Sequence, residues 1–186
     1  MPAKDFDKSR QFDVITPIHV AFFSFPTPLM KAVEKAKVIR IVRAELEAQY
    51  RRVAAAAREA HGYATDPDSK AESKYDTRSL EASYLAVGQS EKADELAAAI
   101  RSFQPEAFPP FSKDQAADLG AVVHVRYPDR SSAFFVLATR GGGVSCELEG
   151  SSIMVVTPST PVFQALEGGR SGDRVPDPGF EILSVL

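Results

Sequence analysis

A long apolar stripe with helical spacing constrains the fold of the first half of this chain. Apolar side chains recur every three or four residues from Ile39 to Ala57, and a second such pattern runs from near Ser69 to Phe103. This spacing predicts two helices that each bury one face. Helices of about 30 residues are roughly 45 Å long, and a short connection between them predicts an antiparallel hairpin. The stripe residues are Ile39, Val42, Leu46, Tyr50, Val53 and Ala57, then Leu80, Tyr84, Val87, Ala93, Leu96, Ile100 and Phe103.

Local signals predict the ends of the first helix. Thr27 can cap it with Pro28 at the first helical position, and His61 followed by Gly62 predicts its end. The hairpin is therefore assigned to residues 28–104, with its tip near residues 62–76.

Residues 1–27 form an extension that we expect to be poorly ordered. An alternative explanation is a start codon assigned too early, with Met30 as the natural beginning. Three basic residues precede the apolar stretch Ile18–Phe25, as in an export signal. That stretch is short, contains His19 and is followed by Pro26 rather than by a small-residue cleavage site, so export is not favoured.

Prolines separate the helical half from a strand-like half. Residues 105–112 contain three prolines and read as a linker. Residues 113–186 then show short alternating apolar runs, bounded by turn residues, with one short helix expected at Pro161–Leu166 after a Ser/Thr cap. The predicted class is α+β: a long N-terminal helical hairpin of coiled-coil type, followed by a small, mostly antiparallel sheet with one helix packed on it.

Composition excludes several classes of protein. The net charge is −3 over 186 residues, so any contact with DNA or RNA must be local. Cys146 is the single cysteine, which rules out an internal disulfide and fits a reducing cytoplasm. The three histidines are widely spaced and form no zinc pattern. No apolar run reaches the ~18–20 residues of a membrane helix.

An acidic cluster lies between the two helical stretches. Asp66, Asp68, Glu72 and Asp76 stand among two lysines. One reading is structural: Asp68 or Ser69 caps the second helix, Asp66 favours its dipole, and Glu72 completes a capping box with Ser69. The other is functional, because exposed carboxylates at the far end of a hairpin add little stability and suit a metal ion or a basic partner.

Other candidate chemistry is weaker. Gly141–Gly143 suggests a phosphate cradle, but it lacks a P-loop lysine and precedes a strand, which favours a hairpin turn. Cys146 fits a buried structural thiol, and His124 fits an exposed strand histidine. His61 fits a partner of the helix dipole. No Ser-His-Asp or Cys-His constellation is present, so an autonomous enzyme is not supported.

Two segments resemble the bacterial Gre transcript-cleavage factors. Asp68–Tyr75 is similar to the family's hairpin tip and shares Asp68, Lys70 and Tyr75 with it. Thr160–Val175 is the more specific match, because several residue types agree at fixed offsets. The agreeing residues are Pro161, Ala165, Leu166, Gly168, Gly172, Asp173 and Val175. The stretch from Lys74 to Tyr84 resembles a divergent Gre-type subgroup, and together the likeness covers about residues 30–186.

The resemblance implies a function. Gre factors insert their hairpin into the secondary channel of RNA polymerase, where tip carboxylates help to hold a second Mg²⁺ beside the 3′ end of the nascent RNA and the polymerase cuts its own backtracked transcript. Asp68 would then be the metal-side acid, with Glu72 and Asp66 as candidate partners. Thr160 and Pro161 would contact the rim of the polymerase channel. The protein would act as a monomer in this complex, although its oligomeric state is open.

Two alternatives accompany this reading. The family's second tip acid falls on Ala71, so the protein could instead occupy the channel and inhibit or modulate polymerase without stimulating cleavage. Glu72, one residue on, is turned by about 100° around a helix. The C-terminal domain of Gre factors also resembles FK506-binding prolyl isomerases, which implies an isomerase or chaperone role as a third possibility.

Overall fold

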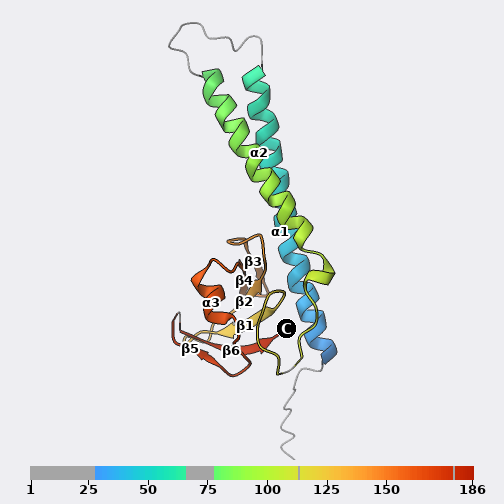
Figure 1. Ribbon diagram of the computed structural model, residues 1–186, viewed down its shortest axis with the longest axis vertical. Coiled ribbons are helices and arrows are strands. Elements are labelled where there is room, and N and C mark those ends of the chain that lie inside the picture. Colours follow the sequence, from blue (N-terminus) through green and yellow to red (C-terminus); the bar gives the residue numbers. More distant parts are fainter. Residues whose placement is uncertain (1–27, 66–77, 113, 178) are drawn as a thin grey trace, which may run out of the picture.

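The computed structural model describes residues 28–65, 78–112, 114–177 and 179–186. Two long helices, α1 (Pro28–Thr65) and α2 (Arg78–Ser102), lie side by side and run in opposite directions (Figure 1). A sheet domain packs against one end of this helix pair, and the other end projects away from it. The order of helices before sheet agrees with the predicted α+β class. The connection between the helices lies outside the described residues, so the hairpin tip stays a prediction, as do the coiled-coil and FK506-binding-protein-like descriptions.

The end predicted for the first helix is wrong. α1 begins at Pro28 as expected but continues through His61 and Gly62 to Thr65. Gly62 does not adopt the left-handed conformation that ends helices at glycine, and its added Cβ would meet nothing. A glycine inside a helix lowers helix stability by only about 1 kcal/mol relative to alanine, and the neighbouring residues that favour helix offset this loss.

The apolar stripe predicted for the first part of α2 is also on the wrong face. Leu80, Tyr84 and Val87 are exposed, Tyr84 to 71%. Ala86 is buried instead, and further along Leu96 and Ala99 are buried in the core shared with α1 and the sheet. In this part of α2 a small side chain is buried, and the larger apolar side chains point to solvent. Periodicity alone cannot choose between two apolar stripes on one helix.

The sheet is mixed and has six strands. Its order is β3-β4-β2-β1-β6-β5, with four antiparallel neighbour pairs and the single parallel pair β2–β4. The prediction of a mostly antiparallel sheet therefore holds for the pairing, but it missed the parallel crossover and the edge strand β5. The strands are β1 (Val122–Arg126), β2 (Ser132–Leu137), β3 (Ser145–Leu148), β4 (Ser151–Val156), β5 (Arg174–Val175) and β6 (Phe180–Val185).

Gly141–Gly143 does not form the expected hairpin turn. The segment joins β2 to β3, but β4 lies between these two strands. The true two-residue turn is Glu149–Gly150, between the antiparallel strands β3 and β4. Both turn residues have positive φ, 50° and 81°, as a type I′ hairpin requires. Lys37 of α1 also donates a hydrogen bond to the Glu149 carboxylate, which ties this turn to the helix pair.

Both faces of the sheet are covered. One face packs on the base of α1 and α2 through side chains that include Val42, Leu46 and Phe103. The other packs on the short helix α3 (Pro161–Leu166) through Phe163 and Leu166. Helix α3 thus forms where the sequence predicts it. Within the described residues, no helix is long and apolar enough to cross a membrane.

A buried lysine joins the helix pair to the rest of the molecule. Lys35 of α1 is 6% exposed, and its Nζ donates hydrogen bonds to the carbonyls of Pro109 and Leu186. The same Nζ lies 4.7 Å from the ring centroid of Phe111. The proline-rich segment, which begins with the 3-10 helix η2 (Pro105–Ala107), is therefore held against α1 rather than acting as a free linker. Burial lowers the pKa of Lys35 from 10.5 to about 8.

We expect this lysine to make stability depend on alkaline pH. Between pH 8 and 10.5 the unfolded chain binds the Lys35 proton and the folded chain releases it, so the free energy of unfolding rises with pH in this window. Relative to Lys35→Met, the free energy of unfolding of the wild type should rise by on the order of 1 kcal/mol between pH 7 and pH 9.5. Partial hydration of the ammonium keeps this rise below the value that the full pKa shift implies. Urea denaturation of both proteins at the two pH values measures this. A difference in stability that stays constant over this range would contradict it.

Candidate functional site

The helix pair places its free end far from the sheet. Val53 of α1 is the last apolar residue that packs with the shared core, and α1 continues to Thr65, roughly 18 Å further at 1.5 Å per residue. α2 begins at Arg78 at the same end (Figure 1). Asp66, Asp68 and Glu72, the predicted catalytic and metal-binding acids, lie outside the described residues, as does Ala71. Within the described ranges, no group of His, Cys, Asp or Glu side chains could hold a metal ion.

An exposed apolar patch lies on α2 near this end. Leu80, Tyr84 and Val87 share one side of the helix at spacings of three and four, Leu85 is exposed as well, and the four side chains are 53 to 71% exposed. Exposed apolar side chains that lie together often mark a contact site. Helical spacing predicts Leu80, Tyr84 and Val87 as an apolar stripe, but it does not predict that they are exposed.

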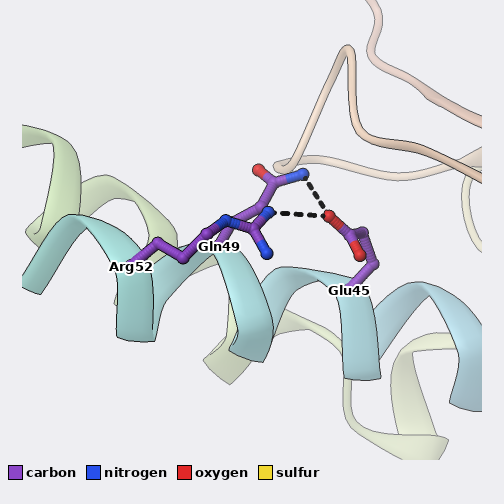
Figure 2. Close-up of polar contacts among 3 residues, drawn as sticks. All are labelled: Glu45, Gln49 and Arg52. Atoms are coloured by element: carbon purple, nitrogen blue, oxygen red, sulfur yellow. Dashed lines mark hydrogen bonds and ion pairs between the residues drawn. The ribbon is translucent and has the colours of Figure 1, made fainter.

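The arginines of α1 are partly neutralised by their neighbours. Arg51, Arg52 and Arg58 are exposed, but Arg52 Nη2 lies 3.2 Å from Glu45 Oε1. Figure 2 shows that Gln49 Nε2 donates to the same oxygen, at 3.1 Å. The hydrogen bond from Gln49, and then that from Arg52, lowers the pKa of Glu45. Arg51 and Arg58, by contrast, make no ion pair among the described residues.

Thr160 and Pro161, the predicted polymerase contacts, lie at the start of α3. Thr160 Oγ1 accepts a hydrogen bond from the Phe163 amide at 3.3 Å and donates one to the Thr157 carbonyl at 2.8 Å. Pro161 is the first residue of the helix and is exposed. Both residues therefore have a structural role as helix cap and first helical residue, and the exposure of Pro161 leaves it free to meet a partner as well.

The rest of the Thr160–Val175 segment also has structural roles. Leu166 is fully buried in the core beneath α3. Gly168 and Gly172 adopt φ of 79° and 95°, which favour glycine. Asp173 accepts a hydrogen bond from the Arg170 amide at 2.8 Å. These residues build the turn between α3 and β5, so the fold explains the spacing of this segment.

His124 is not the exposed strand histidine that the sequence predicts. Its ring stacks on Phe134 with centroids 4.3 Å apart, and it faces the α1 side of the sheet. Its Nε2 is buried and makes no hydrogen bond among the described residues. Burial is the main cause that lowers the pKa of His124, with Glu34 opposing and Arg126 adding to the shift. The neutral ring is therefore favoured at this interface.

Cys146 is half-buried in β3 and is a free thiol. It packs beside the core between the sheet and the helix pair. Burial, and then the nearby Glu45 charge, raises its pKa, which disfavours the reactive thiolate. The expected role as a structural thiol agrees with this environment.

A cleft of about 480 Å³ lies where the Gly141–Gly143 loop meets the helix pair. Its walls come from Gln49 of α1, from Lys92 to Ala99 of α2, and from Thr139 to Val144. Sequence reasoning missed this site because it assigned the glycines to a hairpin turn. The signal in the sequence was that three consecutive glycines directly follow Arg140.

The described residues define an α+β protein that carries a pair of long helices on a mixed sheet. No family model and no curated protein matches this sequence. Among solved structures, the transcription factor Gfh1 matches with 17% identity over 78% of this chain and 93% of that chain, at a TM-score of 0.31. The GreA factor homolog 1 (Gfh1) protein of Thermus thermophilus matches with 18% identity over 77% of this chain and 94% of that chain, at a TM-score of 0.30. Thermus aquaticus Gfh1 matches with 16% identity over 78% of this chain and 94% of that chain, also at a TM-score of 0.30. TM-scores this low do not establish a shared fold.

Proposed function

We propose that this protein is a Gre-type transcription factor that binds bacterial RNA polymerase in its secondary channel and stimulates cleavage of backtracked RNA. The main support is the helix pair itself, whose free end projects roughly 18 Å beyond Val53, the last apolar residue of α1 that packs with the core shared with the sheet. The acidic segment of residues 66–76 connects the helices at that end. The Gre-like spacing of Asp68–Tyr75 and Thr160–Val175 adds independent support from the sequence.

The proposed function requires the protein to supply only one or two carboxylate ligands to a metal ion. Mg²⁺ prefers oxygen ligands and usually takes only one or two protein carboxylates, keeping several waters. In a two-metal mechanism the ions stabilise the attacking and leaving oxygens. Asp68, with Glu72 or Asp66, would supply carboxylate ligands to a Mg²⁺ shared with the polymerase. The protein would thus activate the polymerase's own hydrolysis in the cytoplasm and would not be an enzyme by itself.

A transcript-cleavage assay tests this proposal. Purified bacterial polymerase is stalled in a backtracked complex with end-labelled RNA, and the rate of cleavage is followed with and without the protein in Mg²⁺. We expect at least tenfold stimulation, since carboxylate-held metal contributes several kcal/mol to such reactions. Failure of the protein to bind polymerase at all would overturn the proposal.

Ala71 favours a second candidate function. It stands where the family pattern has an acid, so the connecting segment has one fewer carboxylate for a metal. A protein of this kind would occupy the channel and inhibit or modulate polymerase. Binding to polymerase without stimulation, together with slower initiation or elongation, distinguishes this function from the first.

A further inference from the structure

The cleft between the glycine loop and the helix pair has a backbone suited to an anion. Gly141 and Gly143 are left-handed, with φ of 84° and 83°, on either side of Gly142. Within the described part of the chain, the amides of Thr139, Arg140 and Gly142 donate no hydrogen bond. Successive amides in loops that include left-handed residues form concave anion sites. The loop therefore offers unpaired donors along one wall of the cleft.

The loop is held in place by close packing. A Cβ on Gly141 would lie 3.4 Å from Phe103 Cε2, and a Cβ on Gly142 would lie 3.0 Å from Thr157 Cγ2. The backbone thus lies directly against α2 and against the segment that follows β4. A backbone fixed in this way presents its amides without a large ordering cost when a ligand binds.

The cleft also has an excess of positive charge. Arg140 is exposed and makes no ion pair among the residues that the structure describes. Lys92 Nζ lies 3.0 Å from Glu95 Oε2, and both side chains are more than half exposed. A surface ion pair of this type contributes little, so Lys92 can turn toward an incoming anion. Two cations therefore face one carboxylate at this site.

We propose that this cleft binds the phosphate group of a small molecule. Arg140, Lys92 and the loop amides would hold the phosphate, while Leu96, Ala99 and Val144 would contact the rest of the ligand. A volume of about 480 Å³ is in the range of small-molecule sites. Because the walls come from α1, α2 and the loop before β3, a bound ligand would bridge the helix pair and the sheet domain. This site lies at the base of the helices and does not depend on the proposed polymerase function.

The test uses the full chain, labelled with ¹⁵N and titrated with pyrophosphate at constant ionic strength. We expect saturable shifts of the Thr139, Arg140 and Gly142 amide resonances. Arg140→Gln should weaken binding about tenfold, the size expected for one charge-assisted hydrogen bond. Glu95→Gln should strengthen binding a few-fold, because it removes the opposing charge. Arg174→Gln is the matched control: it removes one exposed cation at β5, the sheet edge opposite β3, and should leave binding unchanged.

Three results would overturn the proposal. The first is a shift that grows without saturation, and the second is an equal loss in Arg140→Gln and Arg174→Gln. The third is tighter binding of a short single-stranded oligonucleotide than of pyrophosphate, since that outcome assigns the loop to a nucleic-acid backbone instead. Circular dichroism of each variant verifies that it is folded.

Discussion

Replacing Asp68 with alanine should abolish stimulated transcript cleavage and leave binding to polymerase nearly unchanged. Asp68 is the acid that matches the Gre-type tip, and a carboxylate that holds a catalytic metal contributes several kcal/mol to the transition state. A loss of that size corresponds to a rate that is lower by about 100-fold. A competition assay for polymerase binding and a cleavage assay on backtracked complexes, run on the same preparations, separate the two effects.

The surrounding residues provide the controls for this experiment. Asp76→Ala removes an acid from the same segment that has no assigned role, and it should retain stimulation. Glu72→Ala and Asp66→Ala identify which acid assists Asp68. The variant that lacks the assisting acid should show stimulated cleavage that is slower by about tenfold or more. Unchanged cleavage in all three of Asp68→Ala, Glu72→Ala and Asp66→Ala would rule out the metal-binding role. If the wild type binds polymerase without stimulating it, Ala71→Glu tests whether one restored acid is sufficient.

Replacing Phe103 with alanine should lower the free energy of unfolding by about 3–5 kcal/mol. Phe103 directly follows α2, is 1% exposed and lies 5.0 Å from Phe108 between ring centroids. It also contacts the Gly141 loop, so its loss opens a cavity where the helices, the proline-rich segment and the sheet meet. Chemical denaturation followed by circular dichroism measures the effect.

Tyr84→Ala is the matched control, because it also removes an aromatic ring, from an exposed position on α2. Tyr84 is 71% exposed, and a surface substitution of this kind changes stability by about 0.5 kcal/mol or less. Equal losses in the two variants would mean that α2 packs through the Leu80–Val87 stripe after all. The comparison therefore tests which face of α2 meets α1.

Much of the local structure could be predicted from the sequence. Pro28 starts the first helix, and Thr160 with Pro161 starts the short one, because capping and proline geometry are decided by neighbouring residues. The main strands were also found close to their observed positions, since alternation of apolar residues is a local pattern. The acidic segment and the Thr160–Val175 pattern, which carry the functional proposal, were likewise visible in the sequence.

The candidate sites could be predicted only in part from local sequence patterns. The catalytic assignment to Asp68, Glu72 and Asp66 stays a prediction, because these residues lie outside the described ranges. The sequence signals only one wall of the cleft, at Arg140 and the glycines, since the walls combine Gln49, Lys92 and Arg140 from three separate segments. The burial of His124 depends on α1 covering that face of the sheet, which no residue near His124 in the sequence signals.

The sequence by itself determined that two long helices precede a small strand-rich domain, and that acids lie between the helices. Only the tertiary structure decided which face of α2 is buried, because the buried Ala86 and the exposed Leu80, Tyr84 and Val87 are all apolar residues of one helix. It also decided that β4 separates β2 from β3, which turns Gly141–Gly143 from a hairpin turn into one wall of a cleft. The physical reason is the same in both cases. Helix and strand formation follow short-range spacing, whereas the choice of face and of strand neighbour follows contacts between residues far apart in the chain.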